Sequence, residues 1–146
     1  MQPKHSKESG FTLIELLISI VIIGILTAII LNTLSTSRNR GYDGKVKIQF
    51  KQLATSIQIY YENNGNYGAT TNNCDNMFAA TTPVNINKFI VGLQNGAAVC
   101  RSTGTAYAVS IPLLNAPVSA DNWCIDSNGR SIAIADPLIA SDTSCN

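Results

Sequence analysis

The chain has 146 residues, a formal net charge of +1 and one histidine, His5. This length suits one domain with a tail rather than two domains, and the near-neutral charge gives no reason to expect a nucleic-acid partner. If the first ten residues are removed, the remaining chain has no histidine. That excludes histidine-based acid–base catalysis and histidine metal ligands.

Residues 1–10 are polar and charged, whereas residues 11–31 are almost continuously apolar. A helix rises about 1.5 Å per residue, so the apolar run spans roughly 30 Å, the thickness of a hydrocarbon core. A secretory signal peptide has a shorter apolar region followed by a small-x-small cleavage site, and no such site follows here. We therefore predict a leader at residues 1–10 and a membrane-spanning helix at residues 11–34.

One carboxylate, Glu15, lies inside the apolar run. A charge in a bilayer interior costs about 2.5 kcal/mol or more, and such residues are usually paired and functional. A cut after Gly10 would give Phe11 a free α-amino group. In a low-dielectric setting, that amine could pair with Glu15 of the same helix or of a neighbouring subunit. The alternative is a tolerated acid near the membrane interface.

The segment Ser9–Leu17, SGFTLIELL, resembles the class III signal of type IV pilins and type II secretion pseudopilins. The resemblance implies that a prepilin peptidase cuts after Gly10 and methylates the new N-terminal Phe11. It also implies that Glu15 is the glutamate that acts in assembly.

The resemblance is close over residues 9–31, looser over residues 38–67, and absent as a motif beyond them. Many family members have a proline in the second half of the apolar segment, where this chain has Asn32. Glycine weakens a helix by about 1 kcal/mol relative to alanine. We therefore predict that any bend or local melting falls near Gly24 or within residues 35–44.

Basic residues flank the apolar run unevenly. The leader has Lys4 and Lys7, and the other side has a larger group, Arg38, Arg40, Lys45 and Lys47. Counted alone, they would place the C-terminal domain inside the cell. The leader motif and the cysteines indicate the opposite orientation. The basic group is then either a solvated or subunit-facing helix surface, or it is held by lipid phosphates; contact with DNA is possible but not indicated.

Residues 42–62 continue as an amphipathic helix. Its apolar residues recur every three to four positions and form one face, namely Val46, Phe50, Leu53, Ile57, Tyr60 and Tyr61. Ile48 and Ile59 fall off this face, so they could contact other subunits. The sequence Asn63-Asn64-Gly65 predicts the end of the helix.

The remaining chain is predicted to be β-rich. A polar loop covers residues 68–83, a short helix covers residues 85–93, and alternating apolar residues predict a strand over residues 106–113. Residues 123–126 and 131–135 flank Asn128-Gly129, which favours a two-residue type I′ turn. That turn places Ile125 opposite Ile132 and Trp123 opposite Ile134.

The four cysteines, Cys74, Cys100, Cys124 and Cys145, have no CxxC spacing and no histidine nearby, which argues against zinc or thioredoxin-like chemistry. They predict two disulfides and an oxidising compartment. Of three possible connectivities, we favour Cys74–Cys100 and Cys124–Cys145, because each joins sequence neighbours. The oxygen-rich stretch 121–129 does not match an EF-hand, so no metal or other cofactor is predicted.

These features predict an α+β pilin-like fold. A long N-terminal helix carries a small antiparallel sheet of three or four strands with disulfide-bounded loops, and residues 35–146 form the globular domain.

The expected function is that of a structural subunit of a type IV pilus or type II secretion-like filament, and not an enzyme. The expected partners are copies of itself, other pilins, prepilin peptidase, inner-membrane assembly machinery and membrane lipids. After processing, the globular domain would lie outside the cytoplasm, in a pilus or a periplasmic filament. The alternative is a minor pilin that binds DNA or a ligand.

Overall fold

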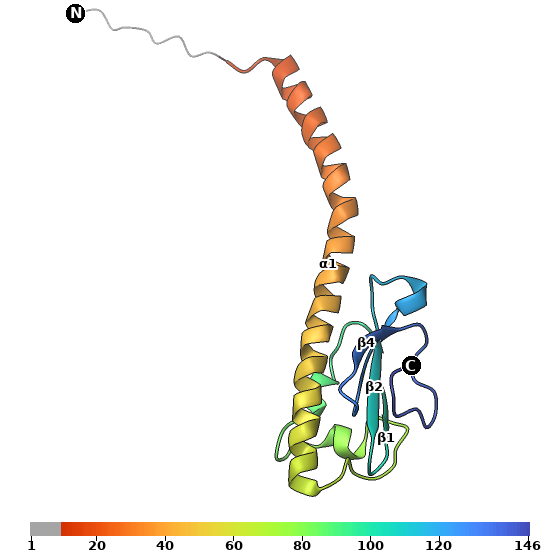
Figure 1. The fold of residues 1–146 in the computed structure, drawn as a ribbon. Helices are drawn as coiled ribbons and strands as arrows, with labels where there is room; N and C mark the ends of the chain where they lie inside the picture. Colours follow the sequence, from red (N-terminus) through yellow and green to blue (C-terminus); the bar gives the residue numbers. More distant parts are fainter. Residues whose placement is uncertain (1–9) are drawn as a thin grey trace, which may run out of the picture. The chain divides into compact units, whose positions relative to one another are not determined.

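The computed structural model describes residues 10–146, apart from the side chain of Asn32. Most of the predicted leader, residues 1–9 with His5, lies outside the described residues. The chain divides into two compact units between Ser37 and Arg38. One helix, α1 (Leu13–Asn64, 52 residues), contributes residues to both units (Figure 1).

In the N-terminal unit, α1 is long and apolar enough to cross a membrane, as judged by length and composition. The helix runs unbroken through Gly24 and through residues 35–44. The helix therefore shows no local melting at the two places to which any melting was assigned. A single glycine costs only about 1 kcal/mol against alanine, and each continuing residue adds a backbone hydrogen bond, so an established helix propagates through it.

The helix ends where the sequence predicts. Gly65 has a φ of +73°, and its N–H donates to the carbonyl oxygen of Tyr61 at 2.7 Å. Glycine adopts this left-handed conformation without a steric penalty and so closes the last turn.

The C-terminal unit contains a four-stranded antiparallel sheet in the order β1-β2-β3-β4. The strands are β1 (Val99–Ser102), β2 (Tyr107–Pro112), β3 (Asn122–Asp126) and β4 (Ser131–Ile134). This architecture is pilin-like α+β and confirms the predicted fold class. The strand predicted at residues 106–113 corresponds to β2, whereas β1 has no counterpart among the predicted strands.

Short 3₁₀ turns occupy the loops, namely η1 (Asn76–Ala79), η2 (Asn87–Phe89) and η3 (Val118–Ala120). The helix predicted at residues 85–93 is thus reduced to the three residues of η2. Gly92 follows with a φ of +77°, a conformation that ends a right-handed helix.

The main core lies between α1 and one face of the sheet. On α1 the predicted apolar face is confirmed for Val46, Phe50, Leu53 and Ile57, which are all at most 2% exposed, whereas Tyr61 at its end is 36% exposed. The sheet contributes the fully buried side chains Val109, Ile111 and Ile125, and the loops add Met77, Phe78 and Ile86.

A smaller core covers the opposite face of the sheet. It contains the buried residues Ala108, Cys124, Ile134, Leu138 and Cys145. Two of these lie in the C-terminal tail, which therefore packs on the sheet. Strand β2 is consequently buried on both faces.

The β3–β4 hairpin has a different register from the predicted one. Trp123 pairs with Ala133 and Ile125 with Ser131, so the predicted pairs with Ile134 and Ile132 are wrong. The loop is longer than two residues because the Asp126 carboxylate accepts the N–H groups of Asn128 at 2.9 Å and Arg130 at 3.1 Å. Such side-chain bonds stabilise a three-residue loop ending on a left-handed glycine, here Gly129 with a φ of +79°. The one-residue difference puts Ile132 and Trp123 on opposite faces.

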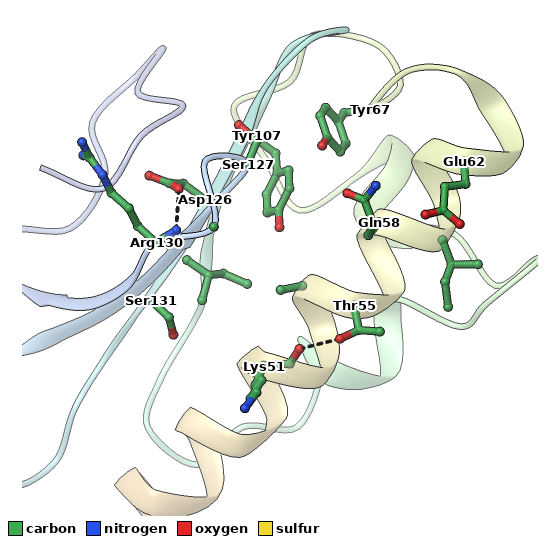
Figure 2. Close-up of a pocket in the computed structure, with 14 residues that line it drawn as sticks. Lys51, Thr55, Gln58, Glu62, Tyr67, Tyr107, Asp126, Ser127, Arg130 and Ser131 are labelled. Atoms are coloured by element: carbon green, nitrogen blue, oxygen red, sulfur yellow. Dashed lines mark hydrogen bonds between the residues drawn. The ribbon is translucent and has the colours of Figure 1, made fainter.

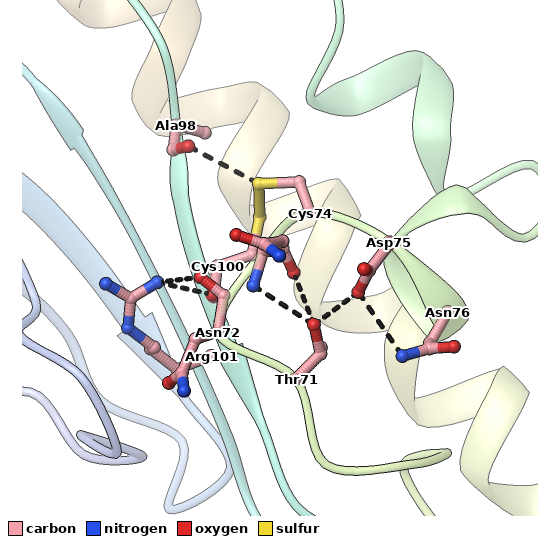
Figure 3. The surroundings of a disulfide bond; sticks show 9 residues. Thr71, Asn72, Cys74, Asp75, Asn76, Ala98, Cys100 and Arg101 are labelled. Atoms are coloured by element: carbon pink, nitrogen blue, oxygen red, sulfur yellow. Dashed lines mark hydrogen bonds between the residues drawn. A yellow bond between two sulfur atoms is a disulfide. The ribbon is translucent and has the colours of Figure 1, made fainter.

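Two disulfides tie the loops to the sheet. Cys74 is joined to Cys100, and Cys124 to Cys145, with Cα–Cα distances of 4.9 and 5.9 Å. These are the two pairings that the sequence analysis favours, in which each cysteine is joined to its neighbour in sequence. Next to the first disulfide, the Arg101 guanidinium donates to the backbone carbonyl of Asn72 (Figure 3). It also donates to the carbonyls of Leu138 and Ile139 in the C-terminal tail.

Candidate functional site

The first turn of α1 is closed by reciprocal hydrogen bonds between Thr12 and Glu15. The Thr12 backbone N–H and hydroxyl donate to Glu15 Oε2, at 2.9 and 2.7 Å. In return, the Glu15 backbone N–H donates to Thr12 Oγ1 at 3.3 Å. This is a capping box, in which two side chains satisfy backbone donors that the helix leaves unpaired.

The predicted site residues therefore differ in their position relative to the helix and in their hydrogen bonds. Gly10 and Phe11 are exposed and precede the helix, and Phe11 is 81% exposed. Glu15 is held by Thr12 through Oε2, whereas its Oε1 accepts no hydrogen bond from the described residues. The pattern Thr12-x-x-Glu15 predicts this arrangement, but the sequence interpretation treated Glu15 only as a charge in an apolar run.

The helix after Glu15 is apolar on all sides. Every large apolar side chain from Leu13 to Leu31 is at least half exposed. The hydroxyls of Ser19 and Thr27 are satisfied within the helix, because they donate to the carbonyl oxygens of Glu15 and Ile23 at 2.7 Å each. A helix that is apolar all round is buried in lipid or in protein, and Glu15 carries the one charged side chain of this segment.

Further along α1, a buried carboxylate connects the helix to two loops. Asp43 is 7% exposed and accepts hydrogen bonds from the Asn95 side chain at 2.8 Å, from Leu114 N–H at 2.7 Å and from Asn115 N–H at 2.9 Å. A carboxylate with three donors is strongly satisfied. The negative charge of Asp43 is therefore directed into the fold, away from the basic residues around it.

A cavity of about 640 Å³ lies between the C-terminal half of α1 and the β3–β4 hairpin. The helix lines it with Lys51, Thr55, Gln58 and Glu62, and the hydroxyl of Tyr107 points toward it (Figure 2). Histidine and free cysteine are absent from residues 10–146, so this lining provides no histidine–nucleophile or cysteine-based catalytic pair. Within the same residues, no cluster of three or more potential ligands is placed to hold a metal ion.

Tyr107 is expected to make the free energy of unfolding fall at alkaline pH. Burial, together with nearby Tyr67 and Asp126, raises the pKa of Tyr107 well above its ordinary value. An unfolded tyrosine ionises near pH ~10, so above that pH the unfolded chain releases a proton that the folded chain retains. We expect the free energy of unfolding to be unaffected by Tyr107 below pH ~10 and to fall as pH rises beyond it.

The measurement is chemical denaturation of the full chain in detergent, followed at neutral and alkaline pH. The Tyr107→Phe variant should lose less stability than the parent between pH ~9 and ~11, because it removes this ionisation. Equal losses in both proteins would contradict the assignment.

The chain is similar to known proteins in two respects. Residues 5–31 match the prokaryotic N-terminal methylation motif. The chain is 34% identical, over 82 residues, to the type IV wide pilus major component PilA4 of Thermus thermophilus. The aligned region covers 56% of this chain and 63% of the relative. No solved structure matches.

The chain combines a long helix that begins at a methylation motif with a small disulfide-linked antiparallel sheet, an architecture similar to that of type IV pilins. More particularly, the aligned region of the chain is similar to PilA4, a type IV wide pilus major component.

Proposed function

We propose that this protein is a structural filament subunit, of a type IV pilus or of a type II secretion-like filament. The observation that carries the proposal is the first half of α1. It starts at a methylation motif, is apolar on every side, and contains a single carboxylate near its start. Copies of such a helix can leave a bilayer only if an equally apolar environment replaces the lipid, and a bundle of the same helices supplies one.

Processing is proposed at Gly10 and Phe11. A prepilin peptidase would cut after Gly10 and methylate the Phe11 amine, as the motif implies. Both residues precede the helix and are exposed. A peptide bond outside helical hydrogen bonding fits more readily into an extended protease cleft than one inside a helix.

Glu15 is proposed to recognise a neighbouring subunit. Cleavage converts the Phe11 amide into a cation, and Glu15 keeps Oε1 available while Thr12 holds Oε2. In an apolar bundle, an unpaired carboxylate costs much more than one paired with an amine, because the pair offsets part of the desolvation cost. The pair would therefore favour the subunit position that brings the two charges together.

Location and further partners follow from the same proposal. The disulfides suit an oxidising compartment, so the globular unit would lie outside the cytoplasm. The partners would be copies of the chain, other pilins, prepilin peptidase and inner-membrane assembly machinery.

Mass spectrometry of the protein isolated from cells with an active peptidase tests the processing step. We expect a chain that begins at N-methyl-Phe11 and is lighter by two hydrogens for each of the two disulfides. A chain that retains Met1 in such cells would overturn the proposal. A chain cut after Gly10 that never enters filaments would separate processing from assembly.

A further inference from the structure

The exposed surface of α1 just after the apolar segment is strongly basic. Five basic residues lie within fourteen positions, and all five are exposed, namely Arg38, Arg40, Lys45, Lys47 and Lys51. The one acidic residue among them is Asp43, whose carboxylate is turned into the fold by Asn95, Leu114 and Asn115. No exposed acid in this segment therefore offsets the positive charge.

Two of these cations have local partners that leave them accessible. Lys47 Nζ lies 4.7 Å from the ring centre of Trp123, and the Tyr42 side chain beside Arg38 raises the pKa of the Arg38 guanidinium. Neither partner carries a negative charge at neutral pH, so each basic group still lacks a counter-ion.

The distance from the apolar segment decides which anions are within reach. An extended residue spans at most about 3.6 Å, so Arg38 lies within about 14 Å of Leu34 and Arg40 within about 22 Å. In helical conformation, as observed, these separations shorten to about 6 and 9 Å. Lipid headgroups occupy a layer of similar depth outside the hydrocarbon core.

We propose that Arg38 and Arg40 bind the phosphate groups of anionic phospholipids in the leaflet that faces the globular unit. This rests on the proposed function, because it requires residues 11–34 to span a membrane with the globular unit outside. Lysine and arginine side chains near a span extend toward headgroups, and each basic residue near an anionic surface strengthens binding by roughly five-fold.

The inference accounts for the unusual charge distribution. Basic residues normally concentrate on the cytoplasmic side of a span. Once the leader is removed, the chain has no basic residue before its apolar segment, and those nearest to it follow on the other side. Anionic lipid provides the counter-ions there and anchors the subunit at a defined depth before assembly.

Native mass spectrometry of the mature full chain tests the proposal without requiring filaments. The chain is released from detergent micelles containing equal amounts of phosphatidylglycerol and phosphatidylcholine, and the retained lipids are counted. We expect the parent to retain phosphatidylglycerol preferentially. The R38Q/R40Q variant should lose roughly 25-fold in that preference, about five-fold for each charge removed.

The matched control is K51Q/K88Q, which removes the same charge from exposed positions further along the chain. It should keep the parent's lipid preference. Equal retention by both double variants, or no preference in the parent, would overturn the proposal. A short DNA duplex is tested in parallel, and loss of DNA binding in R38Q/R40Q with unchanged lipid retention would instead assign the cluster to nucleic acid. Failure to form filaments would affect the proposed function alone.

Discussion

Replacing Glu15 with valine is expected to leave membrane insertion unchanged and to reduce filament incorporation by at least ten-fold. The carboxylate is the single charged group in an apolar segment whose large side chains are all at least half exposed. Valine makes that segment more apolar, so insertion should not suffer. The pair with a neighbour's Phe11 amine is lost, however, and an amine left unpaired among apolar helices is strongly unfavourable.

Two further variants separate the possible roles of Glu15. Glu15→Gln keeps an oxygen that can accept the Thr12 N–H, but it removes the charge. If assembly needs the charge, Glu15→Gln should fail as Glu15→Val does. If it needs only the helix cap, Glu15→Gln should form filaments. Thr27→Val is the matched control, because the Thr27 hydroxyl bonds only to its own helix. Normal filaments from Glu15→Val would refute the proposed pairing.

The Asp126→Ala variant should lower the free energy of unfolding by about 3 kcal/mol, since it removes a buried acceptor of several hydrogen bonds. Asp126 is 2% exposed. Its Oδ1 accepts the N–H groups of Asn128 and Arg130, and its Oδ2 accepts the Cys145 N–H at 2.8 Å. The N–H of Cys145, a fully buried residue, would lose this partner. One side chain thus holds both the hairpin loop and the tail disulfide.

Chemical denaturation under oxidising conditions measures this effect. Asp126→Asn should be intermediate, because its oxygen can still hold the loop while its amide group faces the Cys145 N–H as a second donor. Asp136→Ala is the control, since Asp136 is exposed. A loss for Asp126→Ala no larger than for Asp136→Ala would show that the carboxylate does not hold the tail.

Local patterns in the sequence predicted much of the fold. The three-to-four-residue spacing of Val46, Phe50, Leu53 and Ile57 identified the buried face of α1, and Asn64-Gly65 identified its end. These features depend on neighbours in sequence, so periodicity and glycine chemistry are sufficient to locate them.

The predictions failed where a side-chain hydrogen bond or the pairing of two strands outweighed local propensity. The Asp126 carboxylate changed the hairpin register, although Asn128-Gly129 is a good two-residue turn by propensity. Strand β1 is short, and its pairing to β2 gives it a stability that four residues alone do not reveal. At the candidate site, the position of Glu15 in the apolar run predicted a functional carboxylate. Its hydrogen bond to Thr12 was not predicted, although the spacing Thr-x-x-Glu is typical of a capping box.

The contact between Lys47 and Trp123 provides an intrinsic fluorescence probe of the packing between helix and sheet. Trp123 is the one tryptophan in the chain, and it joins the sheet to a cation of α1 at 4.7 Å. Indole emission responds to nearby charge and to water, so its wavelength and intensity should change when helix and sheet separate. Unfolding of the C-terminal unit could then be followed by fluorescence without any attached dye.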